Sequence, residues 1–319
     1  MNVPCMELEL WTKNRMQSIL KKKQEAIAEK EADKSKAFKN SGEVRSYTVD
    51  LKAVLLAPRL NAAANYYKTK LKVHNQVYYN LSSKDVSCYV WHEGNGGLDS
   101  DVFASIATKF ISNELAQAQT IPQKIVIWSD GCGYQNRNTK LSNALLDLSM
   151  KYRLIIEQKY LEVGHTHMEV DGCHSAIETK LKHRKQVFLP ADYIPIIQSA
   201  RPDQPFKTYY LSYNDFEEFN SDYYTSIRPG YKAGDPCVND LVALQYTPEK
   251  VINYKLAFSD DWAPLPCRPR RSISHSTIRP KLYDRPCPIE RSKFEHLQEL
   301  KKLIPEDYRN FYETLPHKK

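Results

Sequence analysis

The chain has 319 residues, of which 41% are hydrophobic and 11% aromatic, so it holds enough apolar material for one large domain or two smaller ones. This composition excludes a wholly disordered chain. No stretch approaches the roughly 18 consecutive apolar residues of a membrane-spanning helix, and no signal-peptide core follows Met1, so we expect neither membrane insertion nor secretion. The seven cysteines are scattered without a CxxC pair, which predicts a reducing location, nuclear or cytoplasmic, rather than a disulfide framework or a zinc finger.

Lys and Arg exceed Asp and Glu by 46 to 38, a formal net charge of +8, and the excess is uneven along the chain. Residues 262–293 hold eight Lys or Arg against two acids, and their prolines predict an extended conformation. A basic segment is the usual electrostatic signature of a nucleic-acid partner, but a solvated loop can have the same composition. Under the first interpretation Arg268, Arg270 and Arg271 contact phosphates.

The first predicted element is a helix. Residues 7–39 form a charged run without Pro or Gly, which predicts a solvent-facing helix that Ser41-Gly42 ends. We expect it to pack on the rest of the chain through its spaced apolar residues, Leu10, Met16, Leu20 and Ile27.

The middle of the chain alternates strand and helix patterns. Strands are predicted over residues 44–51, 73–81, 86–91, 124–128 and 154–161, and helices over 100–118, 141–148 and 171–182. Ser82-Ser83-Lys84-Asp85 joins the second and third strands as a hairpin turn, and KIVIW at 124–128 is the continuous apolar run of a strand buried on both faces. The predicted order is therefore β-β-β-α-β-α-β-α.

This order is that of the ribonuclease H-like fold, so the predicted fold class is α/β, with a mixed sheet flanked by helices. We divide the chain into an N-terminal charged helix (1–40), a ribonuclease H-like core (41–190) and an irregular C-terminal extension (191–319). The extension is rich in Pro and Tyr, contains the basic segment and closes with a helix over 291–313 that Pro305 breaks. We expect it to form a small appended subdomain of short strands and long loops.

Acidic residues occupy the places where the ribonuclease H-like fold carries its chemistry. That fold has one acid on the first strand, one at the end of the fourth and one on or near a later helix. Asp50 in SYTVDLKAV fills the first place, Asp130 in IVIWSDGCG the second, and Asp171 or Glu178 the third. Such carboxylates converge because phosphodiester cleavage or transfer uses two divalent ions about 4 Å apart, and Mg²⁺ or Mn²⁺ prefers carboxylate oxygens. A lone Asp at a strand end is more often a turn or cap residue.

The residues at the third place have helical spacing. On a helix that begins near residue 171, Asp171, His174 and Glu178 stand at i, i+3 and i+7 and share one face. Either carboxylate can ligate a metal, with His174 as a further ligand or proton shuttle, although Asp171 is also a good helix cap. A basic run suited to binding phosphates follows directly, with Lys180, Lys182, Arg184 and Lys185.

Three alternatives involve neighbouring residues. His165 and His167 could join His174 and Asp171 in a zinc site, but the residues lack cysteines at ligand spacing and the i, i+4 histidine pair of helical sites. Cys132 could be a nucleophile or a plain buried thiol. Gln135 and Asn136, in the amide-rich turn GCGYQNRN, could contact a nucleic-acid backbone or cap the helix that follows.

Several blocks of the sequence are together typical of one family. DLKAVLLAPRL, YYKTKLKVHNQVYYNL, CYVWHEGNGG, WSDGCGYQNRN and GHTHMEVDGCHSAIE resemble, in order, the blocks of an uncharacterised domain family of arthropod and other animal genomes. That family often lies close to transposable elements and is similar to a ribonuclease H-like transposase core. The resemblance covers about residues 45–315. Asp50, Asp130 and Asp171 match its recurrent acids and Glu178 a less regular one, while Tyr134 departs from the glycine that is usual before Gln-Asn.

The resemblance implies a transposase-derived enzyme that uses Mg²⁺ or Mn²⁺ to cut DNA or transfer DNA strands, and a homo-oligomer is compatible with it. In this reading Asp50 and Asp130 bridge the metal ions and Asp171 or Glu178 completes the site. The alternative is a catalytically inactive, domesticated protein that keeps the fold and binds nucleic acid or another partner. Convergence of the acids in space distinguishes the two.

Overall fold

One mixed sheet organises the chain in the computed structural model, which describes residues 5–40, 42–61, 64–161, 168–184, 186–220, 223–266 and 279–319. Within these residues ten strands form a sheet with the order β10-β9-β8-β6-β5-β1-β3-β4-β7, and β2 pairs separately with β3. The strands are β1 (Val44–Leu51), β2 (Leu55–Ala57), β3 (Leu71–Asn80), β4 (Val86–His92), β5 (Lys124–Ser129), β6 (Ile155–Tyr160), β7 (Lys207–Tyr210), β8 (Ala243–Tyr246), β9 (Ile252–Lys255) and β10 (Ala263–Pro264).

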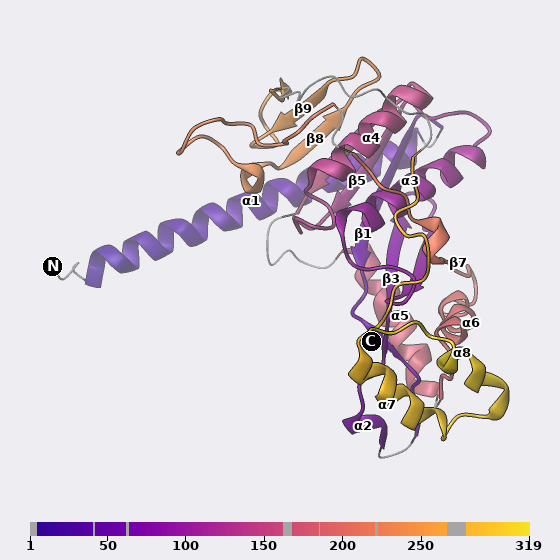
Figure 1. Ribbon diagram of the computed structural model, residues 1–319. Coiled ribbons are helices and arrows are strands. Elements are labelled where there is room, and N and C mark those ends of the chain that lie inside the picture. Colours follow the sequence, from indigo (N-terminus) through magenta and orange to yellow (C-terminus); the bar gives the residue numbers. More distant parts are fainter. Residues whose placement is uncertain are drawn as a thin grey trace.

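Helices cover both faces of this sheet (Figure 1). They are α1 (Cys5–Lys39), α2 (Ala64–Tyr67), α3 (Ser100–Ala116), α4 (Thr139–Tyr152), α5 (Glu169–His183), α6 (Tyr193–Gln198), α7 (Arg291–Lys301) and α8 (Arg309–Glu313). The mixed α/β fold predicted from the sequence is confirmed, and the long elements lie where the periodicity placed them. None of the helices in the described residues is both long and apolar enough to cross a bilayer.

The strand directions change at the centre of the sheet. β1, β3 and β4 pair antiparallel, and the turn between β3 and β4 is closed by Asn80, whose side-chain oxygen accepts hydrogen bonds from Ser82 and Ser83. β5 pairs parallel with β1, and β6 parallel with β5. Each of these parallel steps crosses over through a helix, as parallel pairing requires. The continuous apolar run of KIVIW is explained by this central position, since β5 is buried on both faces.

The extension after residue 190 is continuous with the sheet instead of forming an appended subdomain. β7 pairs parallel with β4 at one edge, while β8 pairs with β6 at the other and is followed by β9 and β10. These strands have four residues or fewer, too short for a period of two to be visible in the sequence. The segment 52–71, expected to be a loop and short helix, also contains the short strand β2.

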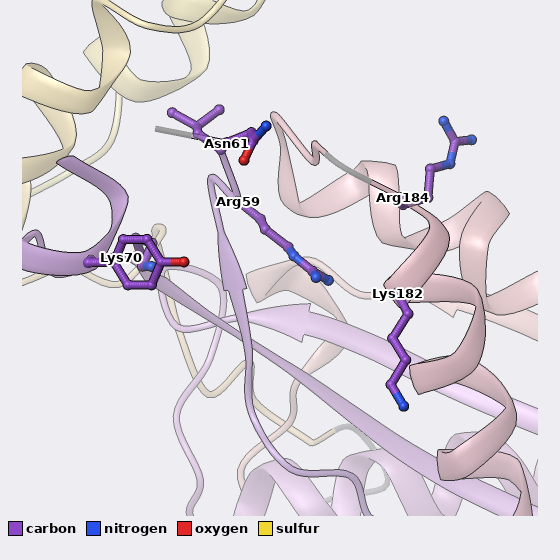
Figure 2. Close-up of a pocket in the computed structure, with 7 residues that line it drawn as sticks. Arg59, Asn61, Lys70, Lys182 and Arg184 are labelled. Atoms are coloured by element: carbon purple, nitrogen blue, oxygen red, sulfur yellow. The ribbon is translucent and has the colours of Figure 1, made fainter. Parts of the chain in front are cut away.

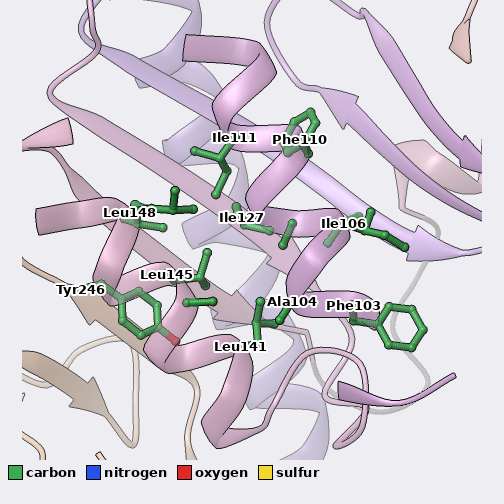
Figure 3. Close-up of a cluster of buried hydrophobic side chains, with 14 of the residues drawn as sticks. Phe103, Ala104, Ile106, Phe110, Ile111, Ile127, Leu141, Leu145, Leu148 and Tyr246 are labelled. Atoms are coloured by element: carbon green, nitrogen blue, oxygen red, sulfur yellow. The ribbon is translucent and has the colours of Figure 1, made fainter. Parts of the chain in front are cut away.

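The side chains of β1 alternate between the two faces of the sheet. Tyr47 and Val49 face α3 and α4, where Tyr78 stacks on Phe110 with ring centroids 3.9 Å apart. Figure 3 shows this cluster, to which α3 contributes Phe103, Ile106 and Phe110, α4 contributes Leu141, Leu145 and Leu148, and β5 and β8 contribute Ile127 and Tyr246. A second core on the opposite face joins α5 and α6 to β3 and β4. The alternate β1 residues therefore turn towards α5, and Asp50 is one of them.

Helix α1 docks through its C-terminal half, and its N-terminal half extends away from the body (Figure 1). The expected apolar contact is wrong for Met16, Leu20 and Ile27, which are 64%, 51% and 41% exposed, and the side chain of Leu10 lies outside the described residues. The buried face instead contains small and charged residues. Asp33 Oδ2 accepts hydrogen bonds from Lys159 Nζ at 2.7 Å and from the Trp128 indole at 3.1 Å. The sequence does not reveal this face, because Lys30 and Asp33, two of its buried residues, are charged like their exposed neighbours.

We expect Lys159→Met to destabilise the protein by about 3–5 kcal/mol, because it leaves the carboxylates of Asp33 and Glu157 buried without their shared cation. Urea unfolding measures this loss. The matched control is Lys36→Ala on the exposed side of α1, which should change the free energy of unfolding by less than about 0.5 kcal/mol. Equal effects of the two substitutions would contradict the role given to the buried ion cluster.

Candidate metal centre

The pairing of β1 with β5 sets Asp50 level with Asp130. The two strands run parallel, and the register pairs Val44 with Lys124 and Thr48 with Trp128, a constant offset of 80 residues. Continuing this register by two residues brings Asp50 opposite Asp130, which follows the last residue of β5. Paired residues of neighbouring strands point to the same face of a sheet. The spacing of the two acids in the sequence is thus the register of the central strand pair.

Helix α5 brings two further side chains to Asp50. It packs on β1 and β3, with Cys173 and Ile177 buried in the second core. Its polar face carries Asp171 and His174, and one ligand atom from each lies within 4.8 Å of the other and of an Asp50 oxygen. His174 Nδ1 is 4.0 Å from Asp50 Oδ2. The structure therefore brings Asp50, Asp171 and His174 together.

Asp171 also stabilises the start of its helix. Its Oδ2 accepts a hydrogen bond of 2.6 Å from the backbone N–H of Met168. The sequence left the roles of helix cap and metal ligand as alternatives. A carboxylate has two oxygens, so the hydrogen bond fixes the side chain without using all of its coordinating capacity.

Asp130 is held by the turn that follows it. Its Oδ1 accepts hydrogen bonds from Asn136 Nδ2 at 2.7 Å and from the backbone N–H of Cys132 at 3.2 Å. Asn136 is itself buried, and its carbonyl accepts a 2.8 Å bond from Gln158 on β6. Asn136 therefore orients an acid, whereas Asn138, two residues on, caps α4.

A cavity of about 480 Å³ opens beside these carboxylates. Asp50 and Asp130 both line it, as does Gln135, whose buried Oε1 finds no hydrogen-bond partner among the described residues. Lys72 and His74 line it from β3. The sequence alone did not single out these two residues; His74 lies on the strand predicted over 73–81, and Lys72 directly precedes it. The cavity thus combines acids for a cation with a lysine that suits a phosphate.

Burial and the neighbouring carboxylates raise the pKa of Asp50. Burial, with the nearby charges of Asp130 and Asp171, raises the pKa of Asp50 from 3.8 to about 7. Burial and the charge of Lys52 lower the pKa of His174 from 6.5 to about 4, so its imidazole is neutral at pH 7. Neutral imidazole is the form that ligates metals, and a dication offsets the repulsion between carboxylates.

Glu178 lies apart from this group. Its carboxylate forms an ion pair with the ammonium of Lys52, whose side chain is only 2% exposed. A buried ammonium needs a counter-charge, so this pair engages Glu178. Of the two candidates for the third acid, the structure brings Asp171 and not Glu178 into the cluster with Asp50.

The remaining predicted residues divide into two groups. Lys182 and Arg184 line a second cavity at the C-terminal end of α5, and Lys180 is half-buried nearby on the same helix. The others lie outside the described residues, namely His165, His167, Lys185, Arg268, Arg270 and Arg271.

The Asp50 carboxyl should contribute stability to the metal-free protein that is lost as the pH rises from about 4 to about 7. The folded state raises the pKa of Asp50, so it binds this proton more tightly than the unfolded chain does, and deprotonation costs folding free energy. Asp50→Asn removes this dependence and should raise the Tm by a few degrees at pH 8 in EDTA, with little effect at pH 4. Thermal melts across this range test it, with the exposed Asp203→Asn as control. Parallel pH profiles for wild type and Asp50→Asn would contradict the assigned shift.

Comparison with known proteins gives a family and little else. Residues 64–228, just over half of the chain, match a domain family of unknown function, DUF7869. No curated protein matches the sequence. A crystal structure of NurA bound to dAMP and manganese has 10% identity and a TM-score of 0.17 over 63% of this chain and 47% of that one. A second NurA structure has 12% identity and a TM-score of 0.15 over 60% and 46%. The chain spans about half the length of these structures. TM-scores this low do not establish a shared fold.

Proposed function

The chain belongs to the DUF7869 family, whose function is unknown, and we propose from its own residues that it is a divalent-metal-dependent enzyme that cuts DNA or transfers DNA strands. The main support is the meeting of Asp50, Asp171 and His174 within 4.8 Å, beside a cavity that Asp50 shares with Asp130. Three carboxylates and a neutral imidazole from three separate elements form a donor set for a hard or borderline dication.

The donor set fits Mg²⁺ or Mn²⁺. Asp130 and Asp171 both lie close enough to Asp50 for their charges to raise its pKa, so Asp50 and Asp130 would hold the metal ions and Asp171 would complete the site. Bound ions would supply activation of the attacking oxygen and stabilisation of the leaving oxygen. The protein's own contribution is to hold Asp130 through Asn136 and Asp171 through the Met168 amide, and to present Lys72 to a phosphate.

The strand arrangement supports the ribonuclease H-like part of this proposal. The five strands β4-β3-β1-β5-β6 have three antiparallel members followed by two that run parallel to the first. We assign residues 41–190 to this core, with 1–40 as a docked helix and 191–319 as an extension that widens the sheet. The acids then stand on the first strand, after the fourth and on the later helix, as a transposase-like enzyme needs.

The proposed setting is intracellular and the proposed partner is DNA. The five cysteines whose side chains the structure describes, Cys88, Cys132, Cys173, Cys237 and Cys287, are unpaired, which favours a reducing compartment, nuclear or cytoplasmic. The formal charge of +8 favours a polyanionic partner.

We expect Asp130→Asn to abolish most Mg²⁺- or Mn²⁺-dependent cleavage of DNA, by about 100-fold or more, because it removes one charge from a site that must hold dications. Binding of DNA should persist, since the substitution lowers negative charge. A nicking and cleavage assay with supercoiled, linear and single-stranded DNA measures the first effect and fluorescence anisotropy the second. Absence of cleavage by the wild-type protein on every substrate would replace this function with that of an inactive nucleic-acid-binding or interaction protein.

Measurement of metal affinity would show whether Asp171 or Glu178 is the third acid. Asp171→Asn should weaken Mn²⁺ binding about tenfold or more in calorimetry or electron paramagnetic resonance, because it removes a ligand. Glu178→Gln is the matched control on the same helix and should leave Mn²⁺ affinity within about twofold, since Glu178 pairs with Lys52. Loss of Mn²⁺ affinity in Glu178→Gln with retention in Asp171→Asn would exchange the two assignments.

A further inference from the structure

A second cavity, of about 430 Å³, lies at the opposite end of α5 from the metal cluster and is strongly basic. Among the described residues, the lining includes no acid and four cationic side chains, those of Arg59, Lys70, Lys182 and Arg184. Figure 2 shows Arg59 and Lys70 arriving from the strand side and Lys182 and Arg184 from the end of α5. Burial and the charge of Arg59 lower the pKa of Lys70, so these two cations repel each other. An anion in the cavity would relieve this repulsion.

The needs of the fold account for only part of this arrangement. Lys182 and Arg184 stabilise the C-terminal end of α5 through the helix dipole, and this effect does not require them to face the cavity. That reason does not apply to Arg59, whose backbone is already fixed by a bridge to Val187, with N···O distances of 2.8 and 2.9 Å. The backbone pairing fixes the position of Arg59, and its side chain lines the cavity.

An exposed aromatic ring borders the same cavity. Tyr66, on α2, lines it and is 87% exposed, and its neighbour Tyr67 is 84% exposed. Large aromatic side chains left in water lose the burial that usually stabilises them. A basic groove with exposed aromatic rings is the combination that binds single-stranded nucleic acid, in which cations contact phosphates and rings stack on unpaired bases.

Helix α5 links this cavity to the metal cluster. Asp171 and Lys182 stand eleven residues apart on α5, a separation of about 16 Å along the helix axis. At about 3.4 Å per stacked nucleotide, this is the length of roughly five nucleotides. One strand can therefore occupy both ends of the helix.

We propose that this cavity binds a phosphate and the adjoining unpaired base of a single DNA strand, which continues along α5 to the metal cluster. The cations Arg59, Lys70, Lys182 and Arg184 hold the phosphate and Tyr66 stacks on the base. The path towards the cluster rests on the proposed function, but binding in the cavity does not require cleavage. The substrate class is thus DNA with a single-stranded or frayed segment.

The test is fluorescence anisotropy of the full chain in EDTA, with a labelled 12-nucleotide oligo(dT) and a blunt duplex of equal length as probes. Wild type should bind the single strand more tightly. Tyr66→Ala should weaken this binding about tenfold, and Tyr66→Phe should restore it, because stacking needs the ring and not the hydroxyl. The ring is largely exposed, so neither substitution should change the thermal melt.

The role of the cations in holding phosphates is tested by salt dependence. For the single strand, Lys182→Ala/Arg184→Ala should reduce the slope of log affinity against log salt by about 0.7 for each phosphate that is no longer neutralised. Lys36→Ala, an exposed lysine on α1, is the control and should leave the slope unchanged. Competition by dTMP that is stronger than competition by inorganic phosphate is expected, since only the nucleotide has a base.

The outcomes separate this inference from the proposed function. Wild-type affinity and slope in Tyr66→Ala and in the double variant overturn the inference, even if Asp130→Asn abolishes cleavage. Equal competition by phosphate and dTMP, together with an unaltered affinity of Tyr66→Ala, also overturns it by reducing the cavity to a site for free anions. Weakened single-strand binding in these variants supports it, even in a protein that never cuts DNA.

Discussion

The parallel pairing of β1 with β5 is the constraint on which the rest of the site depends. Its hydrogen bonds fix the offset between the strands, and that offset sets Asp50 level with Asp130 at the ends of two buried strands. Placing two carboxylates together in a half-buried cleft costs folding free energy. The same burial and repulsion raise the pKa of Asp50. The fold tolerates this repulsion because the strand pairing and the hydrogen bonds to Asp130 and Asp171 hold the acids in place. A dication bound there would offset this repulsion.

Helix α1 contributes to the same site from a distance. Lys30 Nζ donates to Glu169 Oε2 at 2.9 Å, and Glu169 is the first residue of α5. The same helix is joined to β6 through the buried pair of Asp33 and Lys159. The start of α5, and with it Asp171, is thus held between the sheet and α1. A helix that reads in the sequence as a solvated appendage is therefore part of the support of the candidate metal centre.

The charges of α5 are divided along its length. Its first turns present Asp171 and His174 to Asp50, and its last residues present Lys182 and Arg184 to the basic cavity. The proposed binding of a nucleic-acid strand would use both ends, since metal ions at the acidic end could neutralise a reacting phosphate while cations at the other end could hold the flanking strand. The helix dipole favours the same division, with acids near its N-terminus and bases near its C-terminus. One element thereby combines helix stability with the proposed binding of a strand.

The sequence by itself determined the central elements, because each is long enough for a hydrophobic period to be read. The KIVIW run predicted a strand buried on both faces, and β5 is such a strand. It also gave the positions of Asp50, Asp130 and Asp171, since acids at strand ends and on a helix face are local features. The strands β7 to β10 could not be predicted from the sequence, because two to four residues are too few to show a hydrophobic period.

Only the tertiary structure decided which acid completes the cluster and which surfaces meet. Asp171 and Glu178 share one helical face, and the choice between them came from Lys52, a buried cation on the neighbouring chain segment that engages Glu178. The docking of α1 through charged residues rather than through Met16, Leu20 and Ile27 was likewise decided by the partners that β6 offers. The basic cavity joins residues more than a hundred positions apart, Arg59 and Lys182 among them. Such pairings depend on the packing of distant segments, and neither periodicity nor local spacing contains that information.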